Sequence, residues 1–132
     1  MINLYRPNID ESTVDNLISG TRIPTKHIAH ELEGTGVVKR GTPLTTADGE
    51  VFTPSATDIR AILMNDVDTS IPEESMEVAV YRNGEYNQNV IEAALQEAGL
   101  LAAGTNLDPL EIENARAFQI FIAPQHPAPE PW

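Results

Sequence analysis

The chain has 132 residues, which is the length of one domain, and its 8 Lys and Arg against 20 Asp and Glu give a formal net charge of −12. We therefore expect nucleic acid and anionic membrane surfaces to repel it, and the absence of cysteine excludes disulfides and thiolate metal sites. No apolar run approaches the roughly 18 residues that span a bilayer, and segment 1–15 lacks the features of a signal peptide, so we expect a soluble protein made in a cytoplasm.

Residues 1–35 show no sustained period of two or 3.6 residues, and proline and glycine interrupt them at Pro7, Gly20, Pro24 and Gly34. We expect an extended arm here, with at most one or two helical turns between Asp10 and Gly20. The apolar residues of the arm are spaced for a strand more than for a helix, which suits binding to the edge of a partner's sheet. The candidate partner-binding residues are Ile2, Leu4, Tyr5 and Ile9.

Short β-prone runs begin after Gly36, at residues 37–40, 44–46 and 50–53, and Asp48-Gly49 predicts a hairpin between the last two. Residues 59–64 form a more continuously apolar run, which indicates a strand covered on both faces. Residues 77–82 alternate, and Asn83-Gly84 predicts a type I′ hairpin into Glu85-Tyr86. About five or six strands at this spacing favour a compact small barrel or sandwich.

Helical signals follow the strands. Asn89 predicts the cap of a helix whose apolar residues recur at helical spacing and which Gly99 ends. Asp108-Pro109 predicts a second, short helix that runs to about Phe118, and residues 120–122 indicate a last strand. Four prolines in residues 124–132 favour a polyproline-like tail ending in Trp132, which we interpret as a possible anchor for a partner's pocket.

The expected fold is therefore α+β and mainly β. A compact barrel-like or sandwich-like domain with one or two short helices occupies residues 36–123, between an extended N-terminal arm of residues 1–35 and a Pro-rich tail of residues 124–132.

Three segments in this order resemble the lambda-type phage head decoration proteins, which are capsid cement proteins: Val38-Lys-Arg-Gly-Thr-Pro-Leu44, Arg60-Ala-Ile-Leu-Met-Asn-Asp-Val-Asp68 and Val78-Ala-Val-Tyr-Arg-Asn-Gly84, followed by the helix near Asn89. The resemblance covers roughly residues 36–122. It implies a small mixed β domain with one or two helices that decorates the outside of an expanded capsid. It also implies homotrimers at three-fold and quasi-three-fold positions, with the arm against the major capsid protein. The arm of about 35 residues and the Pro-rich tail depart from the family pattern.

The motif Asp66-Val-Asp-Thr-Ser70 follows an apolar run and resembles the Asp-x-Asp-x-Thr motif of haloacid-dehalogenase-type phosphotransferases, in which one Asp attacks phosphorus beside Mg²⁺. That chemistry needs a parallel α/β sheet and a downstream lysine, whereas the last lysine of this chain is Lys39. The competing interpretation is a turn in which Asp side chains cap the backbone.

His27, His30 and Glu31 could supply metal ligands, but their order does not match the His-Glu-x-x-His or His-x-x-Glu-His motifs. The acidic residues at 73, 74 and 77 lack calcium-loop spacing. We therefore predict no enzyme, with no catalytic residue, metal or cofactor. Two alternatives remain open, namely another virion adaptor or head-fibre base module, and a small metal-dependent hydrolase that uses Asp66 and Asp68. Convergence of these two carboxylates with both histidines in one pocket would favour the hydrolase.

Overall fold

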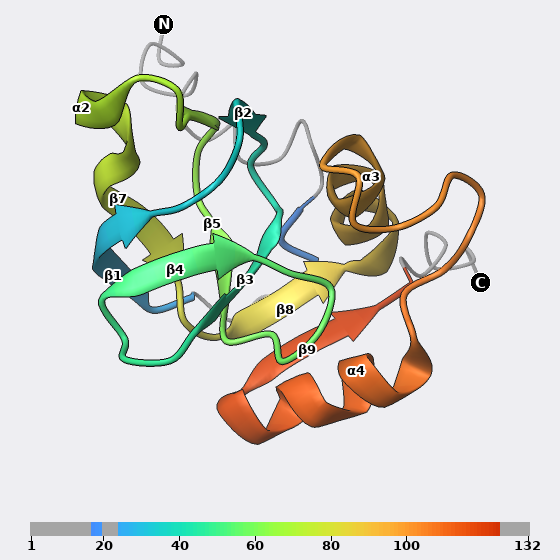
Figure 1. Ribbon diagram of the computed structural model, residues 1–132. Helices are drawn as coiled ribbons and strands as arrows, with labels where there is room; N and C mark the ends of the chain where they lie inside the picture. The colour runs from blue at the N-terminus through green and yellow to red at the C-terminus, as the bar shows by residue number, and fades with distance from the viewer. Residues whose placement is uncertain (1–16, 20–23, 125–132) are drawn as a thin grey trace, which may run out of the picture.

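The computed structural model describes residues 17–19 and 24–124, and it is mainly β with short helices, as the sequence predicts (Figure 1). The strands are β1 (Lys26–Leu32), β2 (Val37–Val38), β3 (Pro43–Thr46), β4 (Val51–Pro54), β5 (Ala61–Leu63), β6 (Val67–Asp68), β7 (Met76–Tyr81), β8 (Gly84–Asn87) and β9 (Ile120–Ala123). The helices are α2 (Pro72–Ser75), α3 (Gln88–Glu97), α4 (Pro109–Ala115) and the 3₁₀ turn η2 (Arg116–Phe118).

Five strands form a closed barrel in the order β1-β4-β3-β5-β7. Strand β1 pairs in parallel with β4, and the other pairs of the barrel are antiparallel. The hairpin predicted at Asp48-Gly49 joins β3 to β4, with Thr46 opposite Phe52. Closure gives every strand of this sheet a paired neighbour on both sides.

A second layer beside the barrel consists of the parallel pair β8–β9 with helices α3 and α4 (Figure 1). Strand β5 lies between the two layers and is buried along its whole length, because Ala61 and Leu63 join the barrel core whereas Ile62 joins the core of the second layer. This confirms the prediction of a strand covered on both faces. The fully buried Tyr86 lies in the second core, and its hydroxyl donates a hydrogen bond to the Asn83 carbonyl.

Helix α3 begins two residues earlier than predicted. Asn87, not Asn89, is its N-cap, because the Asn87 side chain accepts a hydrogen bond from the Asn89 N–H at 3.2 Å. The C-terminal stop is confirmed. Gly99 has a φ of +77°, its N–H donates to the Gln96 carbonyl, and the next N–H, that of Leu100, donates to the Leu95 carbonyl, which is the Schellman pattern.

The predicted hairpin at Asn83-Gly84 is wrong. Strand β7 pairs with β1 and β5, whereas β8 pairs in parallel with β9. A type I′ turn needs a positive φ at both central residues, but Gly84 alone has one, at +129°. The Asn83 side chain instead exchanges two hydrogen bonds with Thr25, through its Oδ1 at 2.7 Å and its Nδ2 at 3.0 Å.

The predicted arm of residues 1–35 is too long, because its described parts belong to the folded body. Leu17 is fully buried in the second core, and β1 is a barrel strand. The sequence does not reveal β1 because its buried residues do not alternate. The N–H groups of His30 and Glu31 both donate to the Glu50 carbonyl, and the buried residues Ala29 and Leu32 are three positions apart instead of two.

Asp48 makes the turn between β3 and β4 sensitive to acid. Its Oδ1 accepts the N–H groups of Glu50 and Val51 at 2.9 and 3.1 Å, and these bonds hold the pKa of Asp48 below its ordinary value of 3.8. A lowered pKa adds stability above pH 3.8 that is lost as the pH falls through the lowered value. We expect Asp48→Asn to lower the melting temperature at neutral pH, and the difference from the unmodified protein to vanish in strong acid. A difference that persists in strong acid would contradict this.

Candidate functional site

Three chain segments lie side by side in the second layer, with β8 in the middle. Ile18 bridges Tyr86 in antiparallel orientation, and on the other side Tyr86 pairs in parallel with Ile122. The Asn87 N–H donates to the Leu17 carbonyl at 2.8 Å, and the Ser19 N–H donates to the Glu85 carbonyl at 3.0 Å. Leu17 and the end of β9 therefore lie at the same end of β8, beside the first turn of α3.

This geometry places the two attachment points close together. Because neighbouring strands are about 4.8 Å apart, Ile18 and Ile122 are separated by roughly 10 Å across β8. The sequence-predicted partner-binding residues Ile2, Leu4, Tyr5 and Ile9 connect to the body through Leu17, and the possible anchor Trp132 connects through the end of β9. These five residues lie outside the described residues. The structure thus shows where both segments join the body.

Two hollows lie beside α3, and we call them together the α3 groove. The first, about 600 Å³, lies between the face of α3 with Val90, Ala93 and Ala94 and a wall formed by Lys39, Arg40, Asn65 and Asp66. The second, about 230 Å³, lies at the C-terminal end of α3, where it is lined by Val37, Val38, Pro54 and Leu100 among others. Glu97 lines both hollows. No sequence pattern predicted the groove, because its walls come from segments far apart in the chain.

The two aspartates of the phosphotransferase-like motif accept hydrogen bonds from backbone N–H groups. Asp68 Oδ1 accepts both the N–H and the hydroxyl of Ser70, at 3.0 and 2.6 Å, and the hydroxyl followed by the N–H lowers the pKa of Asp68. Asp66 Oδ1 accepts the Arg40 N–H at 2.8 Å, and its Oδ2 lies 3.7 Å from Lys39 Nζ. Asp68 therefore caps its own turn, as the competing interpretation proposes, whereas Asp66 fixes the connection between β2 and β3.

The histidines lie elsewhere. His27 Nε2 is 3.4 Å from the Gly49 carbonyl oxygen and its ring is 6.1 Å from the Phe52 ring, while His30 is exposed on β1. Their contacts are with the β3–β4 hairpin, whereas Asp66 lines the α3 groove, so the four residues of the hydrolase alternative are not gathered in one pocket. Within residues 17–19 and 24–124, no three His, Asp or Glu residues are placed to hold a metal ion.

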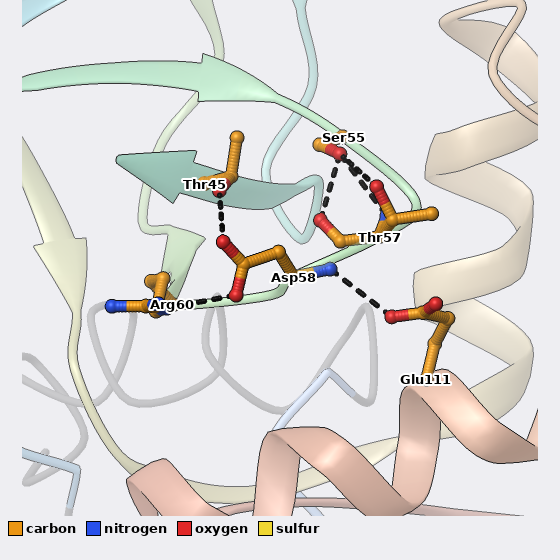
Figure 2. A network of polar contacts seen from close by, with 6 residues as sticks. All are labelled: Thr45, Ser55, Thr57, Asp58, Arg60 and Glu111. Atoms are coloured by element: carbon orange, nitrogen blue, oxygen red, sulfur yellow. Dashed lines mark hydrogen bonds and ion pairs between the residues drawn. The ribbon is translucent and has the colours of Figure 1, made fainter. Parts of the chain in front are cut away.

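A polar network that the sequence did not suggest centres on Asp58, which has a φ of +51° (Figure 2). Its N–H donates to Glu111 Oε1 at 3.1 Å, and its carboxylate accepts the Thr45 hydroxyl at 3.3 Å and pairs with Arg60 Nε at 2.9 Å. The Arg60 guanidinium lies 4.2 Å from the centre of the Phe118 ring. These contacts join the loop after β4 to α4 and η2. Because the polar groups of Asp58 are bonded to other groups of the protein, we interpret the network as a structural link between the two layers.

Helices among the described residues are all too short or too polar to cross a bilayer. Comparison with known proteins found no match, since no family model, no curated protein and no solved structure matches the chain.

Proposed function

We propose that this protein is a structural component of a phage virion that decorates and stabilises the expanded capsid, without enzymatic activity. It binds the major capsid protein on the outer surface as a homotrimer at three-fold and quasi-three-fold positions. The order of the three sequence segments and of the following helix supports this proposal. The closed small barrel with short helices is the kind of domain that the resemblance implies.

The observation that carries the proposal is the common attachment of both terminal segments at one end of β8. A protein that clamps a large partner gains most when its binding segments lie on one face, because they can then engage the partner together. The segments that carry the four apolar arm residues and Trp132 both join the body at this end of β8, which supports their use together.

Strand addition is the physical mechanism of the clamp. Residues 2–9 offer backbone N–H and C=O groups to an exposed edge of a capsid sheet, while alternate side chains fill pockets on that sheet. Three arms per trimer multiply a weak contact into tight binding. A decoration protein also needs a hydrophilic face toward the solvent. The acidic groove on the β3–β4 hairpin fits this role, and threonine hydroxyls there donate to the carboxylates of Glu33, Asp48 and Asp58.

Co-sedimentation with expanded capsids of the phage that encodes the protein tests the proposal. We expect the full chain to pellet with the capsids, and deletion of residues 1–9 to abolish pelleting while leaving the melting temperature nearly unchanged, because these residues precede the described body. Deletion of residues 125–132 is the matched control for loss of a terminal segment, and it should weaken binding less. Full-length protein that remains in the supernatant, or binds only to another virion component, would refute the proposal.

A further inference from the structure

The chain passes from the barrel to the second layer at Asn83-Gly84, since β7 is a barrel strand and β8 begins at Gly84. Asparagine is a thermolabile residue, and it loses its side-chain amide most readily when glycine follows it. Glycine has no Cβ, so little shields its backbone nitrogen from the neighbouring amide carbon. In this protein, however, hydrogen bonds hold both reacting groups.

The Asn83 side chain is fixed by two hydrogen bonds to Thr25, which we call the Thr25–Asn83 clasp. Asn83 Oδ1 accepts the Thr25 N–H at 2.7 Å, and Asn83 Nδ2 donates to Thr25 Oγ1 at 3.0 Å. The clasp extends the β1–β7 ladder, because the Arg82 N–H donates to the Thr25 carbonyl at 2.9 Å. The Asn83 side chain therefore cannot rotate without breaking both bonds of the clasp.

The peptide group between Asn83 and Gly84 is held at both ends. Its carbonyl accepts the Tyr86 hydroxyl, and its N–H donates to the Gln119 carbonyl at 3.0 Å. Gly84 is buried, and a Cβ placed on it would lie 2.9 Å from Tyr86 Oη and 3.1 Å from Pro24 Cγ. The Gly84 nitrogen thus keeps its proton bonded and has little room to turn toward the Asn83 amide.

We propose that Asn83 is a deamidation site that the fold keeps closed, and that it reacts only when the Thr25–Asn83 clasp opens. In the open state the Gly84 nitrogen loses its proton to hydroxide and forms a bond to Asn83 Cγ. The bond between Cγ and Nδ2 breaks, and Nδ2 takes a proton from water and leaves as ammonia. Water then adds to either carbonyl of the resulting succinimide ring, which gives aspartate or isoaspartate at position 83.

The two products have different consequences for the fold. Aspartate keeps the backbone unchanged, and its carboxylate oxygens can accept both the N–H and the hydroxyl of Thr25, so the clasp persists. Isoaspartate carries the chain through the side-chain carbon, which adds one methylene group to the backbone between β7 and β8. This displaces the peptide group that Tyr86 and Gln119 hold, beside the start of the β8–β9 pairing at Gly84. Formation of isoaspartate therefore loosens the connection between the two layers irreversibly.

Peptide mapping by mass spectrometry of the full-length protein, aged in mildly alkaline buffer, measures the conversion of Asn83. We expect conversion in the folded protein to be roughly tenfold or more slower than in the chain unfolded in urea, because the clasp must open first. Thr25→Val, at an exposed position, removes the Oγ1 acceptor and should speed conversion in the folded protein roughly two- to tenfold. Thr25→Ser keeps the hydroxyl and should not. Thr105→Val is the matched control, because it removes an exposed hydroxyl that donates to Ala102, and it should leave the rate unchanged.

Equal conversion in the folded and the urea-unfolded protein would overturn the proposal, as would equal rates for Thr25→Val and Thr25→Ser. The aged protein also supplies the two products for comparison. We expect the isoaspartate form to melt at a lower temperature than the unmodified protein, whereas Asn83→Asp melts close to it. If Asn83→Asp lowers the melting temperature as much as isoaspartate does, the damage comes from loss of the amide, and the assigned role of the backbone is wrong. None of these measurements involves a capsid, so their outcome is independent of the proposed function.

Discussion

Gly84→Ala should lower the free energy of unfolding by roughly 3 to 5 kcal/mol, as overpacking and backbone strain act together. Gly84 has a φ of +129°, which side chains with a Cβ rarely adopt, and its Cβ would lie 2.9 Å from Tyr86 Oη and 3.1 Å from Pro24 Cγ. Tyr86 is fully buried and its hydroxyl is held by the Asn83 carbonyl, so its ring has no room to withdraw. Urea unfolding measures the loss.

Gly49→Ala is the matched control. Gly49 has a φ of +81°, but an added Cβ there meets nothing within 4 Å. This variant isolates the cost of the left-handed backbone, which is about 1 to 2 kcal/mol. If the two variants lose equal stability, the close approach of Gly84 to Tyr86 is not a determinant of the fold.

Deletion of residues 1–19 should cost roughly 3 to 5 kcal/mol more than deletion of residues 1–16, the range seen when a large buried apolar side chain is removed. The longer deletion removes the fully buried Leu17 from the second core, together with the hydrogen bonds that Leu17 and Ser19 make to Asn87 and Glu85. The shorter deletion retains all of these contacts.

Leu17→Ala in the full chain separates the stability that the Leu17 side chain contributes from the stability that the backbone hydrogen bonds contribute. This variant keeps the hydrogen bonds of the segment, and we expect its loss of stability to equal most of the difference between the two deletions. Thermal unfolding of the three variants in one buffer gives the comparison. Equal melting temperatures for the two deletions would mean that residues 17–19 are not part of the stable body.

The sequence predicted those elements whose signals are local. The turn at Asp48-Gly49, the stop at Gly99 and the cap and proline at Asp108-Pro109 depend on residues a few positions apart, and each is found in the structure. The buried strand β5 was predicted because both of its faces are covered, which leaves a continuous apolar run.

Elements that depend on distant partners were missed. The three-residue spacing of the buried residues Ala29 and Leu32 hides the inward face of β1, and its parallel partner β4 is separated from it by the β2 and β3 segments. Asn83-Gly84 has hairpin composition, but pairing of β7 with β1 and of β8 with β9 determined the connection instead. The α3 groove and the Asp58 network likewise join segments whose proximity only the fold creates.

We propose that the terminal segments let this protein reinforce an expanded capsid. The most direct measurement is the temperature at which DNA-filled capsids release their DNA, with and without the added protein. We predict that the full chain raises this temperature, and that the variant lacking residues 1–9 leaves it at the value of undecorated capsids although its own fold is intact. An unchanged release temperature with saturating full-length protein, or an equal rise with the truncated variant, would contradict the claim.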